Sequence, residues 1–146
     1  MTRRLRIVLS VVGAVALAVF VLGAIYLLAP QPPAPDFSLT KLSQKGLFRV
    51  ALEPEPGALT VGEIHTWTVT VTLPDGKPVT GARFAIDGGM PAHHHGLPTS
   101  PKVTAELGEG RYRIEGVKFS MDGLWLLKIA VTAEAGSDEA SFNLQI

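Results

Sequence analysis

Hydrophobic residues follow two patterns in this chain: a continuous run near the N-terminus and a period-two alternation over most of the remainder. From Ile7 to Leu28, 22 consecutive residues carry no charge. A helix of that length spans roughly 33 Å at 1.5 Å per residue, and the hydrocarbon core of a bilayer is about 30 Å thick. The run therefore predicts one transmembrane helix.

The charges that flank this run predict its orientation. Arg3, Arg4 and Arg6 precede it, and positive residues tend to stay on the cytoplasmic side of a membrane. We therefore expect a single-pass protein of the inner (cytoplasmic) membrane, N-in, with everything after Pro30 in the periplasm or outside the cell. A cleaved signal peptide is the alternative, but its apolar region usually has only about 7 to 15 residues. Both interpretations export the remainder of the chain.

A proline-rich stretch separates the apolar run from the rest of the chain and contains Pro30, Pro32, Pro33 and Pro35. Proline lacks a backbone N–H and favours extended polyproline geometry, so the stretch should act as a semi-rigid spacer. We expect a cytoplasmic tip and transmembrane helix at 1–29, a linker at 30–45 and one folded domain at 46–146. A chain of 146 residues has no room for a second domain of ordinary size.

Beyond the linker, apolar and polar residues alternate in short runs bounded by turn residues. Such alternation, rich in β-branched and aromatic residues, is typical of half-buried strands. About seven strands in about 100 residues predict an all-β fold, an immunoglobulin-like β-sandwich. The alternating apolar positions are Phe48, Val50 and Leu52; Trp67, Val69, Val71 and Leu73; Ala82, Phe84 and Ile86; Tyr112 and Ile114; Val117, Phe119 and Met121; Trp125, Leu127, Ile129 and Val131; and Ala140, Phe142, Leu144 and Ile146.

Candidate metal ligands are concentrated in one segment between the predicted strands. Three of the four histidines lie between Gly88 and Pro98, where glycine and proline are too frequent for a regular strand, so we expect a loop. Imidazole is the commonest neutral metal ligand, and a thioether adds preference for soft Cu(I). If the segment is extended, His93 and His95 point to the same side and are favoured over His94 as co-ligands.

Met90, Met121 and His65 extend this candidate to a site of nitrogen and sulfur ligands at one end of the sandwich, provided that the strand ends which carry them lie near the loop. Each has an ordinary structural explanation as well. Methionine at a period-two position is often a core filler, and a single strand histidine often makes only a hydrogen bond. Three adjacent imidazoles have no packing rationale, but they also fit a solvated polar loop.

Charge and composition exclude several classes of function. After Arg6 the chain carries 10 Lys and Arg against 13 Asp and Glu, which argues against nucleic acid. Cysteine is absent, so a metal must be held by His, Met or carboxylate. No Gly-x-Ser-x-Gly motif, phosphate-binding loop or His-Glu-x-x-His helix occurs, and we interpret the protein as non-enzymatic. An exported enzyme that uses Ser100 or Ser120 is the alternative from that class.

Several short motifs, in their order and spacing, resemble the YtkA-like domain, which is grouped with FixH-type proteins. The resemblance covers roughly Gly46 to Ile146. It rests on Gly46-Leu47-Phe48-Arg49-Val50, Asp75-Gly76-Lys77-Pro78-Val79 followed by Gly81-Ala82, Met90-Pro91, Gly110-Arg111-Tyr112 and Met121-Asp122-Gly123-Leu124-Trp125.

The resemblance implies an immunoglobulin-like extracytoplasmic module, commonly membrane-anchored and linked in several contexts to copper handling or to assembly of copper-containing respiratory oxidases. Family members often carry Met-Pro followed by Met or His, and this chain reads Met90-Pro91-Ala92-His93 there. Met90, His93, His95 and Met121 are thus expected to hold a copper ion, with a membrane copper protein or an oxidase subunit as partner. The alternative is a metal-free module that contacts a membrane partner through residues 88–101.

Overall fold

A computed structural model of the chain describes residues 3–30, 33–55 and 59–146 and divides it into two compact units, one ending at Ala34 and one running from Pro35 to Ile146. Three parts of the sequence-based predictions lie outside the described residues. They are residues 1–2 of the predicted tip, Pro32 of the predicted spacer and the side chains at positions 4–8, which include Arg4, Arg6 and the start of the apolar run at Ile7.

The first unit contains a single helix, α1 (Arg3–Leu28). Its segment Leu9–Leu28 is long and apolar enough to cross a membrane, and none of that segment is buried within the structure. The apolar segment is about as long as the hydrocarbon core of a bilayer requires. The predicted N-terminal hydrophobic helix is therefore confirmed, and a membrane anchor and a secretion signal share this property.

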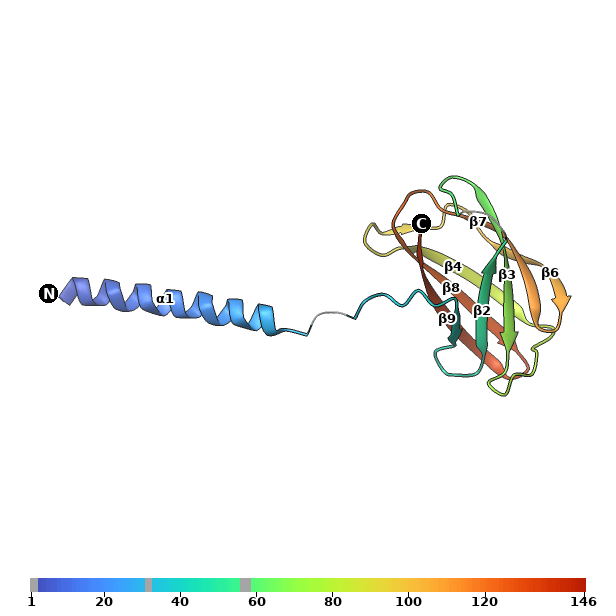
Figure 1. The fold of residues 1–146 in the computed structure, drawn as a ribbon, viewed down its shortest axis with the longest axis horizontal. Helices are drawn as coiled ribbons and strands as arrows, with labels where there is room; N and C mark the ends of the chain where they lie inside the picture. Colours follow the sequence, from blue (N-terminus) through green and yellow to red (C-terminus); the bar gives the residue numbers. More distant parts are fainter. Residues whose placement is uncertain (1–2, 31–32, 56–58) are drawn as a thin grey trace. The chain divides into compact units, whose positions relative to one another are not determined.

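The second unit is a β-sandwich of two antiparallel sheets (Figure 1). One sheet has five strands in the order β1-β2-β3-β7-β6, and the other has four in the order β5-β4-β8-β9. The five-stranded sheet contains β1 (Thr40–Leu42), β2 (Arg49–Pro54), β3 (Ile64–Thr72), β7 (Arg111–Lys118) and β6 (Lys102–Gly108). The four-stranded sheet contains β5 (His95–Gly96), β4 (Arg83–Met90), β8 (Leu124–Ala133) and β9 (Gly136–Gln145).

The core between the sheets consists of the residues that alternate in the sequence. In β3, Trp67, Val69 and Val71 are buried while the threonines between them are half-buried. Trp125 begins the buried series in β8 and is 1% exposed, as is Trp67. Burial of each large apolar side chain contributes about 1.5 to 3 kcal/mol to folding, so these two facing series hold the sheets together.

The structure contains nine strands among the described residues, where the sequence predicted about seven. Strand β6 escaped prediction because two register shifts interrupt its pairing with β7 and only Val103 on it is partly buried. Strands β1 and β5 have only three and two residues. Strand β1 lies inside the segment 30–45 that we expected to be a linker, and it pairs with β2.

The prediction of a loop from Gly88 to Met90 was wrong, because these residues form the last part of β4. The two glycines permit an unusually close approach of neighbouring backbone. A Cβ atom at Gly88 would lie 2.6 Å from the Leu126 carbonyl oxygen of β8, and one at Gly89 would clash with the His95 carbonyl oxygen of β5. The glycines are thus a requirement of strand packing at this point.

The prediction that Met121 ends a strand was also wrong. Strand β7 continues through Gly116, whose φ of 88° accommodates a local irregularity, and ends at Lys118. Met121 lies in the loop that carries the chain to β8 in the other sheet.

Candidate functional site

The strand ends that carry the candidate ligands meet at one end of the sandwich. Strand β3 begins at Ile64, which pairs with Lys118 at the end of β7, and β8 begins at Leu124, which pairs with Gln145 at the end of β9. The loop 119–123 joins β7 to β8 and so connects the two sheets at this end. We call the loops 59–63, 91–94 and 119–123 the histidine end. The strands run from this end to a second set of turns at the other end of the sandwich (Figure 1).

Aromatic contacts hold the histidine end together across the two sheets. The ring of His65 lies 6.0 Å from that of Phe119, and Phe119 packs edge-on against Trp125 at 5.3 Å between ring centroids. The indole N–H of Trp125 donates a hydrogen bond of 3.0 Å to the carbonyl oxygen of Met121. His65, Met121 and the Met90 end of β4 therefore share one region of the domain.

Met90 is part of the core at this end. It is 3% exposed, and its methyl carbon lies 2.7 Å from the position that a Cβ atom at Gly123 would occupy. Gly123 has φ of 130°, a conformation that other residues rarely adopt, and its N–H and C=O both bond to Ile146. The Met90 side chain thus packs close to the backbone of Gly123, where a larger residue would collide with it.

His93 and His94 lie in a tight turn after Met90, His95 begins β5, and all three side chains are exposed. The N–H of His93 donates to the Met90 carbonyl oxygen at 3.1 Å, and His94 adopts a left-handed conformation with φ of 55°. The rings of His93 and His95 nevertheless lie side by side, 6.4 Å apart and inclined by only 19°. The prediction placed these two rings on the same side because it assumed an extended segment. The segment is a turn, so the rings lie together for a different reason.

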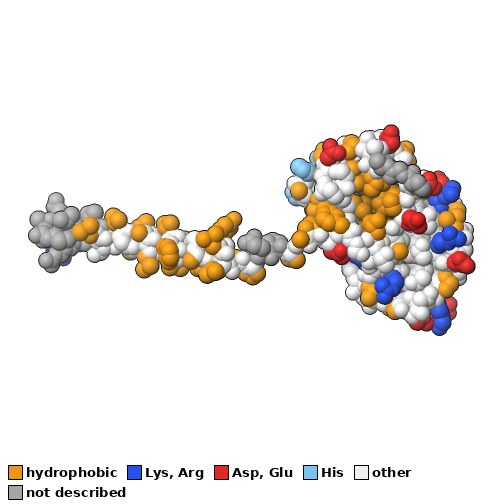
Figure 2. All heavy atoms as spheres, in the orientation of Figure 1, with side chains coloured by type: hydrophobic (Ala, Val, Ile, Leu, Met, Phe, Trp, Pro, Cys, Tyr) orange, Lys and Arg blue, Asp and Glu red, His pale blue; other side chains and the backbone are white. Residues whose placement is uncertain are grey.

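These imidazoles have free ring nitrogens. Within the described residues, no hydrogen bond or ion pair involves the side chains of His93, His94 or His95, and Figure 2 shows a histidine at the surface beside hydrophobic side chains. A shallow hollow of about 260 Å³ lies next to the turn and is lined by His94, His95, Asp87 and Lys128 among others.

His65 differs from the loop histidines because its Nε2 atom already has a partner. That atom lies 2.9 Å from the carbonyl oxygen of Thr60, and the ring packs on Phe119. Both contacts fix the ring against the protein.

The distribution of potential ligands is therefore uneven. No group of three or more His, Asp or Glu side chains that could hold a metal ion occurs in the described part of the chain. The structure brings together His93 and His95, leaves the Met121 side chain 37% exposed on the neighbouring loop, and buries Met90. The exposed candidate ligands at this end are therefore the loop imidazoles and the Met121 side chain.

Exposed apolar residues surround this region and were not singled out from the sequence. Ile64 is 67% exposed and Val61 39%, and the N–H of Gly62 donates to the Phe119 carbonyl oxygen at 2.8 Å. Loop 59–63 therefore lies against loop 119–123. Ile64 breaks the period-two pattern of β3, because it precedes His65 with the opposite parity to Trp67, and that break is the signal that could have marked it.

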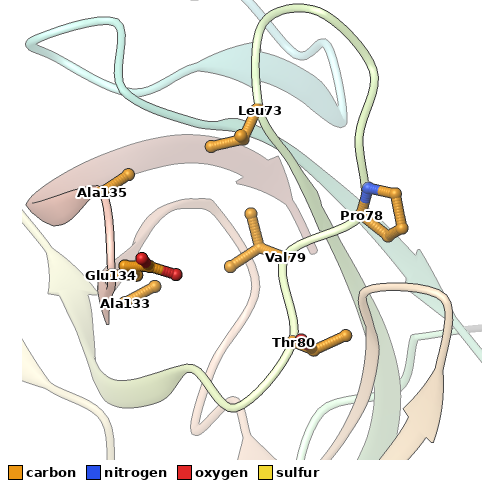
Figure 3. Close-up of a pocket in the computed structure, with 7 residues that line it drawn as sticks. All are labelled: Leu73, Pro78, Val79, Thr80, Ala133, Glu134 and Ala135. Carbon is orange, nitrogen blue, oxygen red and sulfur yellow. The ribbon is translucent and has the colours of Figure 1, made fainter.

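The opposite end of the sandwich has a hollow of its own, whose lining includes no histidine or methionine. It has a volume of about 370 Å³, and Figure 3 shows it between the segment that leads from β3 to β4 and the turn between β8 and β9. Its lining is Leu73, Pro78, Val79, Thr80, Ala133, Glu134 and Ala135. Glu134 is the one charged side chain in that lining.

Polar groups near this opposite end are bonded within the protein. The buried carboxylate of Asp138 accepts hydrogen bonds from the backbone N–H groups of Lys45, Leu47 and Glu139. Burial alone would raise the pKa of Asp138, but the Ser43 hydroxyl and these N–H groups outweigh burial and lower it to about 2. Asp138 thereby fixes the turn 43–48 to β9.

The Tyr112 hydroxyl is the second bonded polar group of this end. It donates to the Val79 carbonyl oxygen at 2.7 Å and accepts from the Ala82 N–H at 3.2 Å. Burial, and then the nearby Glu106 carboxylate, raise its pKa above the ordinary value. Neither Asp138 nor Tyr112 offers a free ligand atom.

Comparison with known proteins gives a family and a related fold. The family model described as YtkA-like matches residues 41–130, which is more than half of the chain. A search of curated proteins gave no match. A solved structure of a DUF4426 family protein from Pseudomonas aeruginosa PAO1 is similar, with a TM-score of 0.52 and 19% sequence identity, over 73% of this chain and 96% of that chain. At that identity the likeness concerns the fold alone. From the extent of the family match, the chain belongs to the YtkA-like family.

Proposed function

We propose that this YtkA-like domain is held at the membrane by α1, faces the extracytoplasmic side and binds a copper ion at its histidine end. Its role would be copper delivery, respiratory oxidase assembly or copper resistance. The observation that carries the proposal is the pair of exposed imidazoles of His93 and His95, 6.4 Å apart with nearly parallel rings.

This ring pair suits one shared ion. Metal–imidazole bonds are about 2.0 to 2.1 Å long, so two nitrogens bound to one ion are at most about 4 Å apart. Ring centroids 6.4 Å apart are close enough for this with small side-chain rotations. Both rings are exposed, so they can turn without disturbing the core.

Sulfur favours Cu(I) over harder ions at such a site. Imidazole suits several transition metals, whereas a thioether ligand selects soft Cu(I). Met121 is the thioether best placed to add to the imidazole pair, because it is 37% exposed on loop 119–123 of the same end. Met90 would have to leave the core and His65 would have to release Thr60, so we assign both to the support of the site.

Competition titration tests the copper proposal. The full chain in detergent micelles is titrated with Cu(I) against a competing chelator, and separately with Cu(II) and Zn(II). We expect one Cu(I) per chain, with binding lost in the variant His93→Asn/His95→Asn and weakened in Met121→Leu. Wild-type binding no tighter than that of the double variant would refute the proposal.

Three further features belong to the proposal. The strand orders β2-β3-β7-β6 and β4-β8-β9 correspond to the ABED and CFG sheets of an immunoglobulin domain, which supports an immunoglobulin-like topology. The arginines at the start of α1, ahead of its apolar run, support an N-in anchor. We propose a non-enzymatic role because the sequence has no Gly-x-Ser-x-Gly motif, phosphate-binding loop or His-Glu-x-x-His helix.

Mass measurement and protease protection test the anchor. An uncleaved helix predicts a membrane-bound chain of full mass whose domain is digested in spheroplasts and protected in intact cells. A chain that has lost its first residues and appears in the soluble extracytoplasmic fraction would indicate a cleaved signal.

A metal-free interaction module is the second candidate, and the exposed Val61 and Ile64 at the same end of the sandwich favour it. Their apolar side chains suit contact with a partner better than contact with water. A partner that is still captured from solubilised membranes after chelation, and by the His93→Asn/His95→Asn variant, would favour this function over copper binding.

A further inference from the structure

The backbone of His94 differs from that of most residues in the domain. It has φ of 55°, and among the described residues other than glycine only Glu109, with φ of 53°, shares this left-handed conformation. In this conformation the Cβ atom of an L-residue crowds the backbone, which costs free energy. The cost is largest for β-branched residues. The turn therefore constrains which residue can stand at position 94.

The turn is fixed on both sides of His94. Before it, the His93 N–H bonds to the Met90 carbonyl oxygen, and after it His95 pairs with Met90 across β4 and β5. The backbone of His95 also lies close to Gly89, and a Cβ atom on Gly89 would clash with the His95 carbonyl oxygen. His94 is thus the residue at which the chain reverses between two anchored neighbours.

This reversal accounts for the ring pair. Side chains two residues apart point to the same side of an extended strand. Residues 91–94 form a turn, so this rule does not explain why the rings of His93 and His95 lie together. Their rings are nonetheless 6.4 Å apart and nearly parallel. The left-handed residue between them turns the chain so that the flanking side chains leave it in similar directions.

Resting on the copper function proposed above, we propose that His94 is a positioning residue: its left-handed backbone holds the imidazoles of His93 and His95 side by side as a preformed chelate, and its own ring is not a ligand. The triplet is then a two-ligand site with a spacer that favours positive φ. Asn and Gly adopt that conformation readily and should replace His94, whereas Val should not.

The test uses the full chain in detergent micelles with the variants His94→Asn, His94→Gly and His94→Val. Glu109→Val is the matched control, because it places a β-branched residue at the other left-handed position, in the turn between β6 and β7. Two quantities are measured: the Cu(I) dissociation constant under chelator competition, and the NMR contact between the His93 and His95 ring protons in the metal-free chain.

We expect His94→Asn and His94→Gly to keep the ring contact and to bind within about threefold of wild type, while His94→Val loses the contact and about tenfold in affinity. Glu109→Val should leave both quantities unchanged. An equal loss in Asn, Gly and Val would make His94 a ligand, and no loss in Val, or the same loss in Glu109→Val, would also overturn the proposal. If the wild-type chain binds no Cu(I), the copper function fails, and the ring contact in the Asn and Val variants still decides whether His94 positions the pair.

Discussion

The two ends of the sandwich place polar side chains in opposite situations. At the turns 43–48, 108–110 and 134–135, which we call the Asp138 end, the Asp138 carboxylate and the Tyr112 hydroxyl are buried and bonded to backbone groups. At the histidine end, three imidazoles project from a turn with no bond to other described residues. Bonded polar groups stabilise a fold, whereas free ligand atoms on a fixed turn are available to a metal or a partner. The difference indicates that the Asp138 end stabilises the fold, and it is the reason that we propose binding at the histidine end.

The largest effect on stability is expected at Asp138. Replacement by Ala leaves the N–H groups of Lys45, Leu47 and Glu139 without their acceptor, and the free energy of unfolding should fall by about 3 kcal/mol or more. Urea unfolding followed by tryptophan fluorescence measures this, because Trp67 and Trp125 are both buried in the sandwich. A loss below about 1 kcal/mol would mean that the Asp138 end is not the stabilising one.

Acid should act on the same carboxylate, with a smaller effect than its removal, since a protonated Asp still has an acceptor oxygen. The folded-state pKa of about 2 lies below the ordinary value of 3.8. The stabilisation by Asp138 is therefore complete above about pH 4 and is lost as the pH falls from about 4 towards 2. Unfolding free energies measured across this range should decline more steeply for wild type than for Asp138→Asn, and parallel curves would contradict the assignment.

Tyr112→Phe should have a moderate effect. Without the hydroxyl, the Val79 carbonyl and the Ala82 N–H lose their partner in a buried place, which should cost about 1 to 2 kcal/mol of unfolding free energy. Copper affinity should not change, because Tyr112 lies at the other end of β7 from loop 119–123. A weakened copper site in this variant would show that the two ends are coupled.

The smallest stability effect is expected for His93→Asn/His95→Asn. Both side chains are exposed and make no bond in the described structure, so the unfolding free energy should stay within about 0.5 kcal/mol of wild type. Copper binding should nevertheless be lost. A large destabilisation would mean that the imidazoles serve the fold.

The sequence predicted the core better than the ends. The burial of four residues was predicted correctly, because a strand with one buried face must alternate apolar and polar side chains. They are Trp67, Val69, Trp125 and Ile129. Strand β6 was missed because its register shifts remove that alternation. Asp138 carried no signal, since its partners Lys45 and Leu47 are more than ninety residues away along the chain and only tertiary packing brings them together.

The candidate site was predictable in its residues and less so in its geometry. Composition drew attention to His93 and His95, but the extended segment assumed for them is a turn. Met90 and Met121 look alike in sequence, yet one is packed against Gly123 in the core and the other is exposed on a loop. The packing of Met90 against Gly123 depends on the tertiary structure, which sequence alone does not reveal.

The most direct test of the binding end is X-ray absorption spectroscopy of the full chain loaded with one equivalent of Cu(I) and then desalted. We predict copper bound by two imidazole nitrogens, with a sulfur contribution that disappears in Met121→Leu. Copper that is not retained, or a spectrum without imidazole scattering that His93→Asn/His95→Asn leaves unchanged, would contradict it.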